Sequence, residues 1–196
     1  MIEIIDSTRP TAYNQRMTDL TTWVNALSNE PLPGAVAAAA VSAAMGAALI
    51  AKAARITLNR RQMDGAAGDE VQALWDLAGR QQALLLELSA ADEGAYRAVL
   101  ETRTLPPSDL ERTGAWQRAT EVPIRIAEAC QALLEAASSL LETCWPAVCP
   151  DPEIGIWLLE TGMRAGLKAA EGNLEYCGDG QEAQALQDRL DALSLE

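Results

Sequence analysis

A long uncharged segment constrains this chain more than any other feature. From Ala35 to Ala51, about 17 residues carry no charge and most of them are alanine. Alanine is the strongest helix former, so the segment predicts a helix. Its length is at the low edge of what spans a bilayer, but Ser42 and Gly46 interrupt it and Lys52 and Arg55 follow at once. We therefore favour a tightly packed core helix, in which Gly46 allows the closest approach of a neighbouring helix.

The composition supports an all-α chain. Only 4% of the residues are aromatic and Phe is absent, so the core must gain its volume from closely packed helices. The hydrophobic share of 49% and the charged share of 22% are typical of a globular domain. A chain of 196 residues is long enough to bury a full hydrophobic core. We expect one helical domain that covers residues 1–196.

Hydrophobic residues at helical spacing predict about six helices. By range, they are a short helix around 17–27, the alanine-rich helix 35–58, a long helix 71–104, a helix from about 108 to 144 with Pro123 inside it, a helix from 151 to about 177, and a closing helix around 186–193. The expected fold class is an all-α, multi-helical bundle with a central alanine-rich helix.

Two helix starts carry capping signals. Ser108 and Glu111 have the spacing of a capping box. Asp151 followed by Pro152 is typical of an N-cap and a first helical position. One face of the helix that follows carries large side chains, and we expect this face to be buried: Ile154, Trp157, Leu158, Thr161 and Ala165.

Composition also excludes several chemistries and partners. The chain has no histidine, which rules out Ser-His-Asp and Cys-His catalysis, the di-iron Glu-x-x-His bundle and most zinc sites. A net charge of −13 disfavours non-specific binding to nucleic acid or to an anionic membrane, so we expect neither partner. The four cysteines form no Cys-x-x-Cys pair and follow no signal peptide, which favours a reduced, cytoplasmic protein.

Asp92 is the strongest candidate for chemistry. It lies four residues after Leu88 and four before Tyr96, which places it on the apolar stripe of its helix. A buried carboxylate needs a partner. Three interpretations are open: a functional group, a helix irregularity near Ser89 that turns Asp92 outward, or a structural salt bridge with Arg55, Arg60 or Arg164.

The other candidates each have a structural alternative. Asp151 can be a helix cap without any function. Arg164, near the edge of the predicted buried face, can bind a carboxylate or phosphate bidentately or extend into solvent. The turn at Pro33 and Gly34 leads into a helix N-terminus, whose free N–H groups can bind an anion. Cys130 lies on a buried stripe and is interpreted as a core residue rather than a nucleophile.

The joint order and spacing of several segments is characteristic. They are Pro31-Leu-Pro-Gly34 leading to Gly46-Ala-Ala-Leu-Ile-Ala51 and Thr57, then Asp92-x-x-Ala95-Tyr96-x-x-Val99, then Val122-Pro-Ile-x-Ile-Ala-Glu128-x-Cys130, and finally Ala147-Val148 with Asp151 and Arg164. With these segments the chain resembles the cyclodeaminase domain of formiminotransferase-cyclodeaminase and the related bacterial methenyltetrahydrofolate cyclohydrolases. The resemblance covers most of the chain. It implies an all-helical bundle that forms a homodimer or higher oligomer, with no metal and no covalently bound cofactor.

The resemblance also implies a substrate and a site. The family acts on one-carbon tetrahydrofolate derivatives, either by cyclising them with loss of ammonia or by opening the methenyl bridge with water. The implied site has two carboxylates for proton transfer, or for pairing with the cationic methenyl group, and four substrate-binding residues: Asp92 and Asp151, and Pro33, Gly34, Arg60 and Arg164. This hypothesis predicts that Asp92, Asp151 and Arg164 converge next to Gly34.

The ligand loop of this chain differs from the family pattern. Where the family has further glycines and a serine after Pro-x-Pro-Gly, this chain has Ala35, Val36 and Ala37, and each adds a Cβ atom. Four other positions that differ are Leu32, Arg55, Ala90 and Ala169. Two alternatives follow from these differences. The chain could be a non-catalytic helical binding or scaffolding relative that has lost the glycine-rich loop, or a divergent enzyme with a different substrate.

Overall fold

The computed structural model describes residues 12–193, and the chain divides into two compact units. The first unit ends at Gly34 and contains helix α1 (Ala12–Asn29), which is followed by a cis peptide bond between Leu32 and Pro33. The second unit begins at Ala35. Its elements are α2 (Ala35–Arg61), α3 (Gly65–Thr102), α4 (Leu110–Thr143), a 3₁₀ turn η1 (Pro146–Val148), α5 (Pro150–Leu174) and α6 (Gln181–Ala192).

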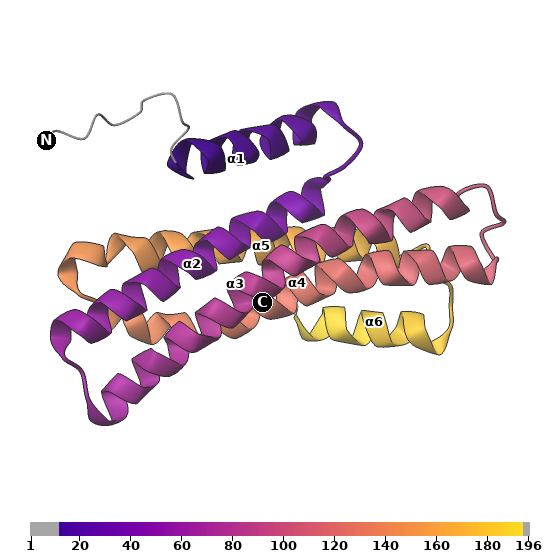
Figure 1. Ribbon diagram of the computed structural model, residues 1–196. Coiled ribbons are helices and arrows are strands. Elements are labelled where there is room, and N and C mark those ends of the chain that lie inside the picture. The colour runs from indigo at the N-terminus through magenta and orange to yellow at the C-terminus, as the bar shows by residue number, and fades with distance from the viewer. Residues whose placement is uncertain (1–11, 194–196) are drawn as a thin grey trace, which may run out of the picture. The chain divides into compact units, whose positions relative to one another are not determined.

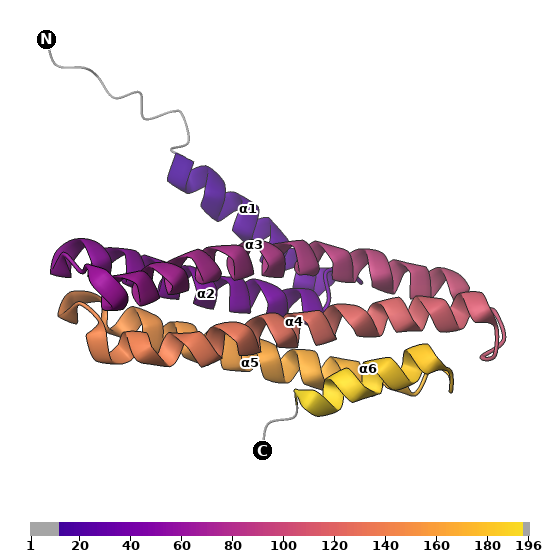
Figure 2. The same cartoon turned by 90° about the horizontal axis from the view of Figure 1, so that it is seen from below.

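Helices α2, α3, α4 and α5 form an antiparallel four-helix bundle. Each follows the previous one after a short connection, and each packs against two neighbours: α2 contacts α3 and α5, and α4 contacts the same two helices. Helix α6 lies along α4 and also touches α5 (Figures 1 and 2). No strand occurs between residues 12 and 193, so the expected all-α bundle of about six helices is confirmed.

Small residues let α2 and α5 approach each other closely. A Cβ atom placed on Gly46 would lie 2.5 Å from the carbonyl oxygen of Gly155. A Cβ atom on Gly155 would lie 2.8 Å from the carbonyl oxygen of Gly46, and one on Gly162 would lie 2.7 Å from the Cβ of Ala43. The expectation that Gly46 marks the closest helix contact is confirmed, because any side chain there would collide with backbone.

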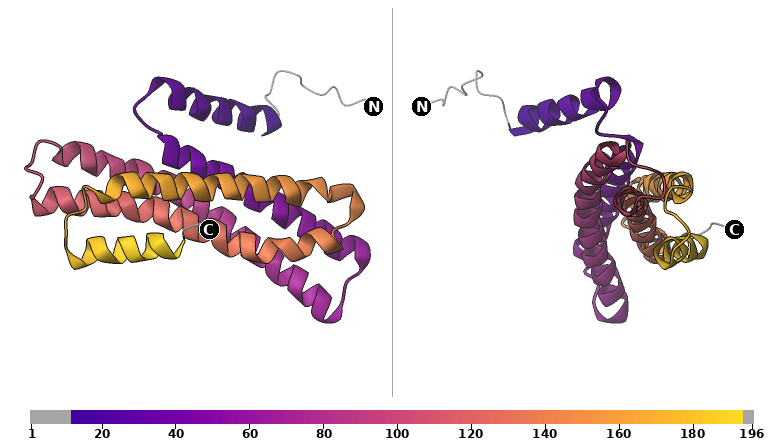
Figure 3. Two further views of the ribbon diagram at one scale, coloured as in Figure 1. Left: turned by 180° about the vertical axis from the view of Figure 1, so that it is seen from behind. Right: turned by 90° about the vertical axis from the view of Figure 1, so that its right-hand side faces the viewer.

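The face of α5 that meets the core is not the expected one. The helix lies against α2 and α4 (Figure 3) and buries mostly small or compact residues, namely Pro152, Gly155, Leu159, Gly162, Met163, Gly166 and Ala170. The residues expected to be buried include Trp157, which is 62% exposed, and Ile154, which is 42% exposed. The reason is the short distance between helices, since three inward glycines allow a contact that a tryptophan would prevent.

Three helix starts also differ from the predicted ones. Helix α4 is capped by Asp109 rather than Ser108, and the Asp109 side chain accepts a hydrogen bond from the Glu111 N–H at 2.9 Å. Helix α5 has Cys149 as its N-cap, so Asp151 is not a cap and lies in the first turn. Proline suits the first helical position, so α5 starts at Pro150, earlier in the chain than predicted. Helix α3 begins at Gly65 rather than near residue 71. Its first turn holds only glycine and alanine, so it carries no stripe of large hydrophobic residues that could predict this start.

Helix α2 is the one described helix long and apolar enough to cross a membrane. Half of its most apolar stretch is buried inside the bundle. A core helix has the same length and composition, so this property is weak evidence for a membrane. The outward side of α2 includes Met45, which is 46% exposed.

Candidate functional site

Asp92 lies where the first turn of α2 meets the last third of α3. Its side chain is 8% exposed, so the expectation that it lies on the buried stripe is confirmed. The carboxylate accepts a hydrogen bond from the backbone N–H of Ala37. One turn earlier on α3, the Ser89 hydroxyl donates to the carbonyl oxygen of Ala37 at 3.2 Å. Two side chains of α3 therefore hold both backbone groups of one residue at the start of α2.

This arrangement decides between the structural interpretations of Asp92. Helix α3 is continuous from Gly65 to Thr102, so no irregularity turns the side chain outward. The partner is a backbone N–H group rather than an arginine. Sequence patterns give no sign of such a partner, because every residue except proline carries the same N–H group.

The surroundings raise the pKa of Asp92 from its ordinary value of 3.8 to about 6. Burial is the largest cause, because it removes water from the charged form. The Ala37 N–H lowers the pKa and the neighbouring negative charge of Glu93 raises it. With a pKa of about 6, both protonation states of Asp92 are accessible near neutral pH, which is what a group that accepts and returns a proton requires.

Asp92 lies beside the N-terminal end of α2, and the neighbouring helices extend beyond this end. Helix α2 begins at Ala35, whereas α3 runs about three turns beyond Asp92 and α4 accompanies it (Figure 1). The first N–H groups of a helix have no acceptor within that helix and form the positive end of its dipole. Asp92 binds one of these groups.

Asp151 lies elsewhere in the bundle. Its Oδ2 atom is 2.7 Å from the ammonium nitrogen of Lys52. This oxygen is buried, and no donor among the described residues meets hydrogen-bond geometry, so the contact is an ion pair rather than a directed hydrogen bond. Lys52 follows Ala37 by fifteen residues on α2, a distance of about 22 Å along the helix axis. Within one chain, Asp92 and Asp151 are therefore not brought together.

The two predicted arginines lie at different levels of the bundle. Arg60 is exposed near the end of α2, about 35 Å along the axis from Ala37. Arg164 is also exposed, and it follows Gly162, which packs against Ala43. Arg164 is therefore level with the first half of α2, where Asp92 binds. Pro33 and Gly34 belong to the first unit and directly precede Ala35 in the chain.

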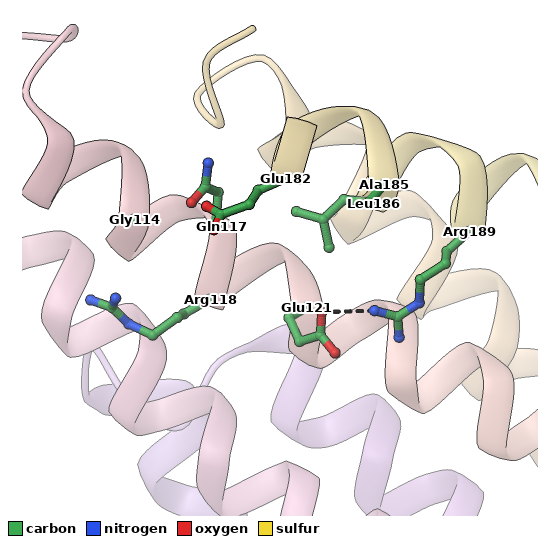
Figure 4. Close-up of a pocket in the computed structure, with 8 residues that line it drawn as sticks. All are labelled: Gly114, Gln117, Arg118, Glu121, Glu182, Ala185, Leu186 and Arg189. Carbon is green, nitrogen blue, oxygen red and sulfur yellow. Dashed lines mark hydrogen bonds and ion pairs between the residues drawn. The ribbon is translucent and has the colours of Figure 1, made fainter. Parts of the chain in front are cut away.

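A separate groove of about 480 Å³ lies between α4 and α6 (Figure 4). Arg189 of α6 forms ion pairs there with Glu121 at 2.7 Å and with Glu128 at 2.8 Å. These contacts attach α6 to α4. None of the predicted site residues lines this groove, so we do not assign the site to it.

The fold defines an all-α helical-bundle protein with a buried carboxylate, Asp92, where α3 meets the start of α2. The family described as formiminotransferase-cyclodeaminase matches residues 20–192, and the chain belongs to this family. It is 26% identical over 177 residues to a methenyltetrahydrofolate cyclohydrolase of Methylorubrum extorquens, which covers 86% of this chain and 85% of that protein. It is 30% identical over 178 residues to a formimidoyltransferase-cyclodeaminase of Sus scrofa, covering 86% of this chain and 32% of that longer protein.

A solved structure shows the same fold. The crystal structure of formiminotetrahydrofolate cyclodeaminase from Thermotoga maritima matches with a TM-score of 0.79 and 20% sequence identity, and the match covers 89% of this chain and 87% of that chain. The resemblance stated from the sequence segments is thus confirmed for family and fold. The chain is a cyclodeaminase-like protein, and no finding favours the non-catalytic alternative.

Proposed function

We propose that this protein hydrolyses a methenyltetrahydrofolate to a formyltetrahydrofolate. The observation that carries the proposal is the buried carboxylate of Asp92 at the N-terminus of α2, in a chain of this family. Among the relatives matched over most of their length, the cyclohydrolase is similar in sequence, at 26% identity over 85% of its length, whereas the formiminotetrahydrofolate cyclodeaminase, covered to 87% at 20% identity, shows the fold alone. We therefore favour hydrolysis over cyclisation with ammonia loss.

Asp92 is the group to which we assign proton transfer. The bridging carbon of a methenyltetrahydrofolate is bonded to two nitrogens and shares their positive charge, which an ionised carboxylate attracts. As a base, Asp92 takes one proton from water while the water oxygen bonds to this carbon. As an acid, it returns that proton to the nitrogen whose bond to the carbon breaks. The second water proton leaves to solvent as the formyl carbonyl forms.

The placement of the other predicted residues supports unequal roles. Arg164 is level with the first half of α2 and has no ion pair among the described residues, so we propose that it holds a folate carboxylate. Arg60 lies about 35 Å from Ala37 along α2, too far for the same task in one chain. Asp151 is paired with Lys52, and we place Asp92 rather than Asp151 at the reacting carbon.

A direct assay tests the proposal. Purified protein should consume the methenyltetrahydrofolate chromophore faster than the uncatalysed reaction, and Asp92→Asn should lower kcat by at least about 100-fold, the usual contribution of a general acid–base group. Asp76→Asn is the matched control, because Asp76 is exposed on the same helix and should keep wild-type turnover. Absence of turnover in the wild type, or full turnover in Asp92→Asn, would contradict the proposal. Titration of folate against tryptophan fluorescence separates loss of binding from loss of chemistry.

The pH dependence of the reaction gives a second prediction. Because Asp92 must be ionised to act as the base, kcat/KM should fall as the pH drops through an apparent pKa of about 6. Glu93 raises the pKa of Asp92, so Glu93→Gln should shift this midpoint to lower pH without abolishing turnover. Rate profiles from pH 4.5 to 8, on the order of half-unit steps, would show the shift. If Glu93→Gln left the midpoint of the pH profile unchanged, the titrating group would not be Asp92.

We also propose that the protein forms a homodimer through the outward face of α2 and α5. This face, defined by Met45, Leu49, Ile154, Trp157 and Leu158, is apolar and at least partly exposed. The outward side of α5 has Glu153 before Trp157 and Lys168 after it. Two antiparallel copies of α5 would therefore bring opposite charges together at both ends of the contact, with Ile154, Trp157 and the exposed Glu160 and Arg164 between them.

A cytoplasmic location completes the proposal. The four cysteines are free thiols, which suits a reducing compartment. Immunodetection after cell fractionation would test this expectation, and recovery outside the cytoplasmic fraction would contradict it.

A further inference from the structure

Two thiols meet at the junction between α4 and α5. Cys144 directly follows the last residue of α4 and Cys149 is the N-cap of α5, with the η1 turn between them. The Cys149 thiol donates to the carbonyl oxygen of Trp145 at 3.5 Å, and the Cys144 thiol donates to the same oxygen at 3.7 Å. The two sulfurs are therefore neighbours, because both lie within hydrogen-bond distance of one oxygen atom. Both cysteines are free.

The chain around Cys144 is held firmly by the end of α2. The Thr57 hydroxyl donates to the Cys144 sulfur at 3.8 Å and accepts a hydrogen bond from the Trp145 N–H at 3.0 Å. The Arg61 guanidinium donates to the Cys144 carbonyl oxygen at 2.9 Å. These contacts leave Cys144 only 3% exposed, so a reagent in solution cannot reach it directly.

Cys149 is the accessible member of the pair. Its side chain is half-buried rather than buried and lies at the start of α5, so a small disulfide in solution can reach its sulfur. Burial is the largest cause that raises the pKa of Cys144 to about 11, and the neighbouring Cys149 raises it further. Cys144 is therefore rarely ionised and is suited to the second step of an exchange rather than the first.

We propose that Cys144 and Cys149 form a reversible disulfide by exchange with low-molecular-weight disulfides. In the first step the Cys149 thiolate attacks one sulfur of the small disulfide, and one small thiolate leaves and takes up a proton. In the second step Cys144 loses its proton and attacks the Cys149 sulfur, which releases the second small thiol. The protein loses two protons and two electrons, and the small disulfide is reduced to two thiols.

The bond would connect the end of α4 to the start of α5 across the η1 turn. This location is distinct from the proposed folate site, because Asp92 binds at the opposite end of α2. The inference therefore does not depend on the catalytic proposal, and its test needs no folate.

The other two cysteines serve as internal controls. Cys130 is fully buried, and burial raises its pKa to about 12. Cys177 is also fully buried, and its sulfur pairs with the Thr120 hydroxyl at 3.1 Å. Neither contacts a second thiol among the described residues, so both should stay reduced while the protein is folded.

The test uses the full folded chain in buffers with a series of ratios of reduced to oxidised glutathione. After acid quenching and alkylation in denaturant, mass spectrometry should show the loss of two hydrogens, a Cys144–Cys149 bond, and alkylation at the two remaining thiols. Cys144→Ser should accumulate a stable mixed disulfide on Cys149, and Cys149→Ser should block the reaction. Circular dichroism melts check that the variants fold.

Three outcomes would overturn the proposal. One is four alkylated thiols at the most oxidising ratio. Another is a wild-type protein that stops at a mixed disulfide on Cys149, and the third is a bond that includes Cys130 or Cys177 in the folded protein. The wild-type result alone decides the matter if a serine variant fails to fold.

Discussion

Asp92 is a buried carboxylate whose partner is a backbone N–H group. Its contribution to the free energy of unfolding therefore depends on pH. The folded-state pKa of about 6 lies above the ordinary value of 3.8, so the folded protein binds this proton more tightly than the unfolded chain. The resulting stabilisation is fully present below about pH 4 and is lost as the pH rises through about 6. A shift of this size corresponds to about 3 kcal/mol.

Asp92→Asn should remove this dependence. An asparagine can still accept the Ala37 N–H but carries no charge, so the variant should be more stable than the wild type at pH 8, by up to about 3 kcal/mol. Near pH 4 the difference should vanish, because Asp92 is then protonated. Urea unfolding at several pH values measures this, with Asp76→Asn as the control. A stability difference that does not change with pH would contradict the assignment.

At the level of single elements, the glycines of α5 set how closely the bundle packs. Gly155→Ala would place a Cβ atom 2.8 Å from the backbone oxygen of Gly46, which cannot move without shifting α2. We expect a loss of about 1–3 kcal/mol in the free energy of unfolding. Gly172→Ala is the matched control on the same helix, because a Cβ atom there meets nothing within 4 Å.

The control should even gain stability, since alanine favours a helix over glycine by about 1 kcal/mol. Chemical denaturation of both variants measures the two effects side by side. Equal stability of Gly155→Ala and Gly172→Ala would mean that α2 and α5 are not in close contact. If Gly155→Ala lowers the stability while Gly172→Ala raises it, packing rather than helix propensity determines the stability at Gly155.

For the whole molecule, the outward face of α2 and α5 makes a prediction about assembly. Trp157 is the most exposed residue of this face, and Trp157→Glu would place a charge within the proposed dimer contact. The wild type should have twice the chain mass of 20.9 kDa in light scattering after size exclusion, and the variant should have the single mass. Leu86→Glu is the control, because Leu86 is 48% exposed on a different helix. A dimer that survives Trp157→Glu would exclude this face.

Local patterns in the amino-acid sequence predicted the all-α class and the helices of the bundle. They also predicted the buried stripe with Asp92 and the close contact at Gly46. Each of these depends on helical spacing or on the size of one side chain, which the sequence states directly. The family resemblance was also visible there, because it depends on the order and spacing of whole segments.

Tertiary structure decided the rest, because spacing along one helix does not say on which side its neighbours lie. The larger apolar side chains of α5 predicted its buried face, but close packing required its glycines inside and left Trp157 outside. The backbone partner of Asp92 has no sequence signature. The separation of Asp92 from Asp151 appears only once α2 and α5 lie antiparallel, which places Asp151 beside Lys52 and far from Ala37.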